Sequence, residues 1–225
     1  MRSKSYKQVK EKIGAERMEI AAAAEFLKTN ARAKFDETVE IHMNLGVDAS
    51  KSDQMVRGSV VLPAGTPTQK RVAVFTSDKA KQEEAKAAGA VLVGGEELIT
   101  TIEKNGISDI DITIATPDMM AKIAKIAKVL GPKGLMPNPK TGTVTPDVAG
   151  AVKELAAGKV SFKMDAQGNM HAAVAKVSWD ADKTQQNIEA FIAAVKAVKP
   201  ATQRGAFIKN VVLKTSMSPA VRISA

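Results

Sequence analysis

The chain has 225 residues, of which 44% are hydrophobic, and its formal net charge is +9. This length suits one large domain or two small ones, and the apolar share is enough for packed cores, which excludes a disordered tail. Cysteine is absent, so disulfides and thiolate metal sites are excluded. No apolar segment follows the basic N-terminus as in a signal peptide, and no run of about 18 apolar residues predicts a membrane span. We therefore expect a cytoplasmic protein that is not attached to a membrane.

The first third of the chain predicts one helix and two strands. An alanine-rich helix is expected from Arg17 to Asn30. From Thr38 to Leu45 apolar and polar residues alternate strictly, which predicts a strand buried on one side. A second strand of this kind is expected from Met55 to Leu62.

The middle of the chain alternates short apolar runs with helical stretches. Strands are expected at 72–75, 90–93 and 110–114, and helices at 77–88, 96–104 and 117–130. The last of these helices has Thr116 as a candidate cap and Pro117 at its first position. Strands that alternate with helices predict a parallel sheet covered on both faces, so we expect an α/β Rossmann-like three-layer domain.

The last third returns to the pattern of the first. Strands are expected at 160–164, 170–179 and 207–215, and an amphipathic helix at 183–199. Neither terminal third holds enough apolar residues to close a core alone, so we expect them to pack together. The predicted architecture is an α+β terminal domain, an antiparallel sheet with two helices, formed by residues 1–67 plus 158–225, with the α/β domain of residues 68–157 inserted.

The positive charge lies mainly in the two ends of the chain. Residues 68–157 hold 12 Lys and Arg against 11 Asp and Glu, whereas the remaining residues hold 21 against 13. A mixed, solvated surface would account for a small excess, but an excess confined to the terminal parts favours a polyanionic partner such as a nucleic acid.

A loop rich in glycine and proline is the most distinctive segment. Residues 130–144 read LGPKGLMPNPKTGTV, with three glycines, three prolines, two lysines and no acidic residue. Such a loop is rigid and lets a ligand approach the backbone, although a plain surface connector has the same composition. The preceding helix carries a lysine every third residue, which is either a ridge for a phosphate backbone or an ordinary solvated face. The candidate anion contacts of this region are Lys122, Lys125, Lys128, Lys133 and Lys140.

A second candidate site lies at the predicted junction between the first helix and the first strand. Lys34, Phe35 and Thr38 follow Arg32 there. The aromatic ring can pack on a ribose or base while the cations meet phosphates, or it can cover the helix end as a core residue. Aromatic residues are only 4% of the chain, so recognition of a folded RNA by backbone and shape fits better than stacking along a single strand.

Motifs of enzymes are absent. No phosphate-binding GxxxxGK[ST] or GxGxxG sequence follows a predicted strand, and we expect no metal site and no cofactor. His42 and His171, the only histidines, are far apart in sequence and read as surface or core residues. Two alternatives stay open on the residues alone: an α/β enzyme acting on a phosphorylated small molecule, and a general DNA-binding protein.

Four segments resemble a known family. They are GPKGLMPNPKTGTV at Gly131 to Val144, KFDETVE from Lys34, VRGSVVLP from Val56 and SMSP at Ser216 to Pro219. Together they resemble the bacterial type of large-subunit ribosomal protein number one, which forms the ribosomal stalk. The resemblance covers nearly the whole chain, and it implies two domains, the first formed by both termini.

The resemblance also implies a function without catalysis. Such a protein binds large-subunit ribosomal RNA as a mobile stalk at the exit site, assists release of deacylated tRNA, and represses its own operon messenger RNA; we expect a monomer when it is free. RNA contacts are implied at Glu25, Lys34, Phe35, Thr38, Ser216, Met217 and Ser218. The carboxylate of Glu25 would accept a hydrogen bond from an RNA hydroxyl. The family usually has Thr-Met-Gly where this chain has Ser216-Met217-Ser218, and the side chain of Ser218 replaces a glycine that lets backbone approach RNA.

Overall fold

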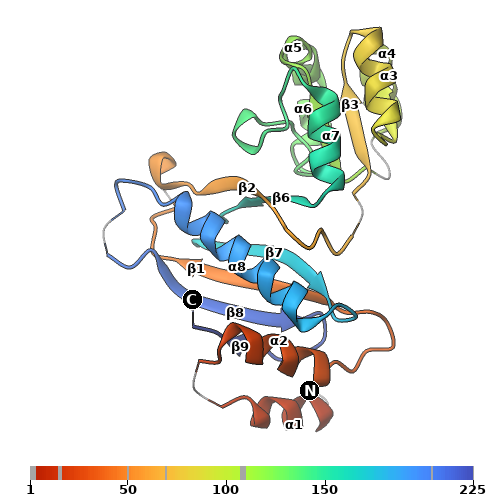
Figure 1. Cartoon of the computed structure of the whole chain (residues 1–225). Helices are drawn as coiled ribbons and strands as arrows, with labels where there is room; N and C mark the ends of the chain where they lie inside the picture. The colour runs from red at the N-terminus through yellow and green to blue at the C-terminus, as the bar shows by residue number, and fades with distance from the viewer. Residues whose placement is uncertain are drawn as a thin grey trace. The chain divides into compact units, whose positions relative to one another are not determined.

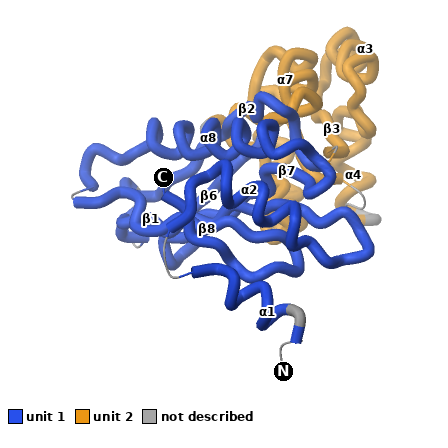
Figure 2. The backbone as a smooth tube through the Cα atoms, turned by 60° about the horizontal axis from the view of Figure 1, so that its bottom comes forward, with its two compact units in different colours: residues 1–67, 160–225 blue, residues 68–159 orange. Residues whose placement is uncertain are grey.

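The computed structural model describes residues 4–14, 17–49, 51–68, 70–106, 110–203 and 205–224. The chain divides into two compact units, one formed by Met1–Pro67 with Val160–Ala225 and the other by Thr68–Lys159 (Figure 2). Both units mix helices and strands, as the sequence predicts. No helix in the described segments is both long and apolar enough to cross a membrane. The assignment of RNA binding to the discontinuous unit stays a prediction.

The first unit contains a four-stranded antiparallel sheet in the order β7-β1-β8-β9 (Figure 1). Its strands are β1 (Thr38–Leu45), β7 (Asn169–Lys176), β8 (Ile208–Thr215) and β9 (Val221–Arg222). The bounds predicted for β1 are confirmed to the residue, because its alternation is unbroken. Strand β9 was not predicted, since two residues are too few to show a period.

One face of this sheet is buried under two helices. In β1, Ile41 is fully buried while its neighbours His42 and Glu40 on the other face are only half-buried. Helices α2 (Ile20–Thr29) and α8 (Ala181–Ala197) pack their apolar side chains into the same core. The opposite face of β1 therefore carries the polar half of the predicted alternation.

Two smaller parts complete this unit. Strands β2 (Arg57–Val61) and β6 (Lys159–Lys163) form a separate two-stranded sheet, and a 3-10 turn, η1 (Ser52–Gln54), precedes it. The N-terminal helix α1 (Lys4–Lys12) was not predicted, because lysine fills four of its nine positions and hides the apolar period. Its Val9 is nevertheless buried, and Ile13 packs against the core.

The second unit has a three-stranded parallel sheet in the order β4-β3-β5. Its strands are β3 (Val72–Phe75), β4 (Leu92–Gly94) and β5 (Ile112–Ala115). Two separate hydrophobic clusters lie on its two faces, as expected where helices cover both sides. One cluster includes residues of α3 (Lys79–Ala87) and α7 (Val148–Ala156), and the other includes residues of α4 (Glu96–Asn105) and of the segment 117–130.

The predicted helix over 117–130 is not a single α-helix. It is divided into η2 (Pro117–Met119), α5 (Met120–Ile123), η3 (Ala124–Ile126) and α6 (Ala127–Leu130). Pro117 does occupy a first position, but the Thr116 hydroxyl caps nothing. The Met119 amide, which a capping oxygen would accept, already donates to the Thr116 carbonyl in a 3-10 turn.

The glycine- and proline-rich loop folds back onto the second unit. The Thr113 hydroxyl donates to the Leu135 carbonyl, and Val144 forms a parallel bridge with Ala115. Gly134 and Gly142 both have φ of +70°, a conformation that glycine adopts without strain. The loop, which includes η4 (Pro139–Thr141), is therefore held by contacts within its own unit.

Candidate nucleic-acid interface

The two terminal segments that resemble the family meet at one end of the four-stranded sheet. Strand β1 pairs with β8 so that Val39 lies opposite Thr215. At this end the Thr38 amide donates to the Ser216 hydroxyl oxygen over 3.2 Å. The fold thus brings residues 34–38 and residues 215–218 together although almost the whole sequence separates them.

A buried carboxylate, Glu37, ties these segments to each other. One of its oxygens accepts hydrogen bonds from the Thr215 hydroxyl and, over 3.0 Å, from the Met217 amide. The other accepts from the amides of Arg32 at 3.1 Å and Ala33 at 2.9 Å. The carboxylate therefore fixes both the chain before β1 and the turn after β8.

The ionisation of Glu37 follows from these contacts. Burial acts to raise its pKa, because the side chain is only 2% exposed. The hydrogen bonds from Thr215, Ala33, Met217 and Arg32 together outweigh burial and lower the pKa below its usual value. Glu37 is thus a charged anchor inside the surface, and its four donors leave it little capacity to contact a ligand.

Two apolar side chains project from the segments that Glu37 holds. Phe35 is 58% exposed and Met217 is 61% exposed. The interpretation of Phe35 as a core residue is therefore wrong, since the ring is outside every described hydrophobic core. Lys34 and Arg32 are also exposed, so cations and two apolar groups share this surface.

The hydroxyls of the turn close hydrogen bonds within the protein. The Ser218 hydroxyl accepts from the Thr215 amide over 2.8 Å and donates to the Pro219 carbonyl over 3.2 Å. In contrast, the Ser216 hydroxyl accepts the Thr38 amide and donates to none of the described residues, so its proton can be donated outward. Ser218 therefore shapes the turn, whereas Ser216 keeps a donor.

Glu25 and Lys176 lie on two further elements of the same unit. Glu25 is exposed on α2, and its side chain makes no hydrogen bond or ion pair with any described residue. Lys176, in β7, donates to the Thr38 hydroxyl over 2.8 Å. Sequence reasoning missed both Lys176 and Glu37. The signal for Glu37 was its position two residues before Val39, which places a carboxylate on the apolar side of β1.

The lysines of the second unit differ from one another. Lys122 forms an ion pair with Glu96 over 2.5 Å, and this contact holds the pKa of Glu96 below its usual value. Lys122 is therefore partly neutralised, whereas the exposed Lys125 acts on Glu96 only through its charge, and Lys128 is exposed as well. Lys133 is exposed in the loop, and the side chain of Lys140 lies outside the described part of the structure.

No group of three or more His, Asp or Glu residues in the described ranges is arranged to hold a metal ion. The histidines, which the sequence separates widely, lie side by side on β1 and β7 with their Nδ1 atoms 2.6 Å apart. In complexes with nucleic acids, cations contact phosphates while apolar groups contact bases. The described fold and site thus indicate the class of binding proteins, because exposed apolar side chains and exposed cations share one fixed surface.

Comparison with known proteins names the family. The sequence model of the ribosomal protein L1p/L10e family matches residues 27–219. A relative, the large ribosomal subunit protein uL1 of Mycoplasma capricolum subsp. capricolum, is 48% identical over 222 residues, which cover 98% of this chain and 97% of that protein. The chain belongs to the ribosomal protein L1p/L10e family. It is a structural ribosomal protein and not an enzyme, so the alternative of an α/β enzyme for a phosphorylated small molecule is wrong.

Proposed function

We propose that this protein is a constituent of the large ribosomal subunit whose discontinuous unit binds ribosomal RNA and thereby forms the mobile stalk at the tRNA exit site. The observation that carries the proposal is the set of four hydrogen bonds by which Glu37 joins the segment before β1 to the turn after β8. Glu37 holds the exposed Phe35 and Met217 on segments that its hydrogen bonds fix, and Lys34 precedes the ring in the chain. A surface fixed before binding loses less conformational entropy when RNA is bound.

Each part of this surface has a separate role in the proposal. The Phe35 ring and the Met217 side chain pack on a ribose or base, while Lys34 meets a phosphate. Ser216 donates its hydroxyl proton to a 2′-hydroxyl or phosphate oxygen, and Thr38 lies beside it. Glu25, being exposed and unpaired within the described chain, accepts a hydrogen bond from an RNA hydroxyl. Ser218 acts through the shape of the turn.

The remaining parts of the proposal concern other partners. The exposed Lys125, Lys128 and Lys133 of the second unit attract exit-site tRNA or neighbouring RNA, so that the protein assists release of deacylated tRNA. A messenger segment that imitates the ribosomal site would bind the same surface, and the protein would then repress its own operon. We place this activity in the cytoplasm, with the free protein a monomer that needs no cofactor.

A salt-titrated binding measurement tests the proposal. The full chain is titrated with the stalk-forming fragment of the large-subunit RNA, with a scrambled RNA of equal length, and with duplex DNA. We expect a preference of at least about 1,000-fold for the stalk fragment that persists at raised salt, because specific contacts remain when counterion release is weakened. Equal affinity for all three polyanions would contradict the proposal.

A further inference from the structure

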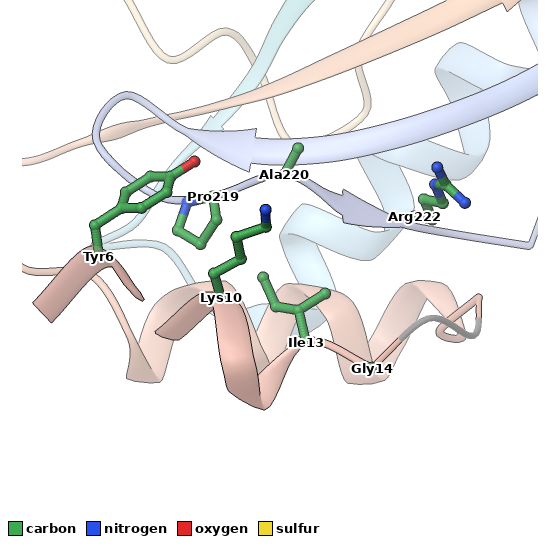
Figure 3. A pocket seen from close by; sticks show the side chains of 7 residues that line it. All are labelled: Tyr6, Lys10, Ile13, Gly14, Pro219, Ala220 and Arg222. Atoms are coloured by element: carbon green, nitrogen blue, oxygen red, sulfur yellow. The ribbon is translucent and has the colours of Figure 1, made fainter. Parts of the chain in front are cut away.

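A cavity of about 500 Å³ lies between helix α1 and the chain that follows the Ser216 turn (Figure 3). Tyr6 and Lys10 of α1 and Ile13 directly after it line one side, and Pro219, Ala220 and Arg222 line the opposite side. In Figure 3, the side chains of Lys10 and Ile13 extend toward this second segment. The volume is in the range of cavities that hold small ligands.

The charge of the cavity favours an anion. Lys10 and Arg222 are exposed, and neither makes an ion pair with a described residue. None of the described residues that line the cavity is acidic. Two cations without a carboxylate between them attract a phosphate, and the guanidinium of Arg222 can bind it with two parallel hydrogen bonds.

The walls between the cations are apolar. Ile13 is half-buried, Pro219 is buried, and the Tyr6 ring stands beside Pro219 in Figure 3. A free inorganic phosphate has no apolar part that could pack on these walls. A nucleotide does, because its ribose or base can lie against them. The combination of charge and apolar surface therefore fits a nucleotide.

The position of the cavity connects it to the surface around Glu37. Pro219 directly follows Ser218 in the chain, and Met217 is two residues earlier. The hydrogen bonds of Ser218 to Thr215 and Pro219 fix this short connection. Met217 and the cavity are therefore held at a fixed separation by the protein backbone. One strand of RNA can contact Met217 with one nucleotide and the cavity with the next.

We propose that this cavity is a further RNA subsite, which takes the phosphate and ribose of one nucleotide beside those that contact the Ser216 turn. The inference rests on the proposed function, but it assigns RNA contacts to Lys10, Arg222 and helix α1. Residues 4–14 and 220–222 lie outside the 27–219 range that the family model matches. The subsite is therefore an addition to the surface that the family resemblance implies.

Three variants of the full chain test the subsite, each compared with wild type for affinity to the stalk RNA fragment over a series of salt concentrations. Lys10→Ala and Arg222→Ala each remove one phosphate contact. We expect each to weaken binding by about threefold to tenfold and to reduce the slope of log K against log salt by about 1. Ala220→Phe fills the cavity while keeping both cations, and we expect a loss of similar size.

Lys7→Ala is the matched control, because Lys7 is exposed on the same helix and does not line the cavity. It removes the same charge, and we expect less than a twofold change in affinity with an unchanged slope. Equal effects of Lys7→Ala and Lys10→Ala, or unchanged binding by Ala220→Phe with unaltered thermal unfolding, would overturn the subsite. If all four variants bind like wild type, which itself prefers the stalk fragment, only the subsite fails. If wild type shows no preference, the proposed function fails with it.

Discussion

His42 and His171 stand directly opposite each other on β1 and β7, and their rings meet edge to face with centroids 4.8 Å apart. Their Nδ1 atoms are 2.6 Å apart, so one nitrogen must donate and the other accept. The pair therefore holds one proton between the two facing nitrogens. Protonation of both rings would put two like charges, and two donors, against each other.

This geometry predicts that acid weakens the fold before any carboxylate is protonated. Burial lowers the pKa of His42, His171 and Lys214 lower it further, and Glu40 only partly opposes them. Asp165, 3.7 Å from His171, faces the second ring. The unfolded chain then binds more protons than the folded one, so stability is full above about pH 6.5 and is lost as pH falls toward the folded pKa of His42. Urea unfolding at about pH 7.5 and about pH 5.5 measures this loss, with a slope of at most about 1.4 kcal/mol per pH unit for one proton.

Two substitutions separate the causes. His42→Gln should flatten the pH dependence in this window, since the titrating group is gone. His171→Gln should reduce the slope without abolishing it, because burial of His42 still lowers its pKa. If His42→Gln keeps the wild-type slope of stability against pH, the group that takes up the proton is not His42.

Glu37→Gln should loosen the interface from within. Glutamine keeps only one of the two acceptor oxygens, so either the Thr215 hydroxyl and the Met217 amide or the amides of Arg32 and Ala33 lose their acceptor. We expect a loss of about 1–3 kcal/mol in the free energy of unfolding, measured at neutral pH in urea. RNA affinity should fall as well, because the turn is no longer fixed.

The pH dependence of this effect has a defined sign. The pKa of Glu37 is lowered in the folded protein, so its contribution is present above its unfolded pKa and is lost as pH falls through the folded value. The difference between wild type and Glu37→Gln should therefore shrink in acid. Glu40→Gln is the control, since Glu40 is half-exposed and pairs with Lys214 on the open face of the sheet. If Glu40→Gln lost as much stability as Glu37→Gln, the loss in Glu37→Gln could not be assigned to the buried hydrogen bonds of Glu37.

Phe35→Ala should weaken RNA binding while leaving the fold intact. The ring is 58% exposed, so its removal creates no cavity in a core. Loss of one stacked or packed base contact corresponds to about 1–3 kcal/mol of binding free energy. Binding titrations and thermal unfolding are measured together.

Val198→Ala serves as the comparison, because Val198 is another exposed apolar residue of the same unit, at the end of α8. Its affinity for the stalk fragment should equal that of wild type. Cooperative unfolding lost in Phe35→Ala, or equal binding by both variants, would contradict a direct role of the ring.

Regular patterns in the sequence predicted regular elements well. The alternation from Thr38 to Leu45 gave a strand with the observed bounds, and the run Val72–Phe75 did the same. The prediction of an element failed where the spacing of apolar residues was weak or misleading. Helix α1 was hidden by its lysines, and the segment 117–130 reads as one helix because its apolar spacing suits both α and 3-10 turns.

The candidate site divides along a different line. Exposed residues such as Phe35 and Met217 could be named because the resemblance to the family covers their segments. Glu37 and Lys176 could not, since their importance depends on hydrogen bonds between segments that the chain brings together only on folding. The neutralisation of Lys122 by Glu96 is of the same kind, because the two residues lie 26 positions apart and belong to different helices.

Ser218→Gly tests the position at which this chain departs from the usual Thr-Met-Gly of the family. The Ser218 hydroxyl accepts the Thr215 amide and donates to the Pro219 carbonyl, so glycine removes two short-range hydrogen bonds from the turn. It also removes a half-buried side chain and increases the freedom of the unfolded backbone. We expect the free energy of unfolding to fall by about 1–2 kcal/mol, measured in urea.

The RNA affinity of Ser218→Gly should stay within about threefold of wild type, because closer approach of the backbone to RNA offsets the looser turn. Ser224→Gly, outside the turn, is the control, and a large loss of affinity in Ser218→Gly alone would show that the hydroxyl itself contacts RNA.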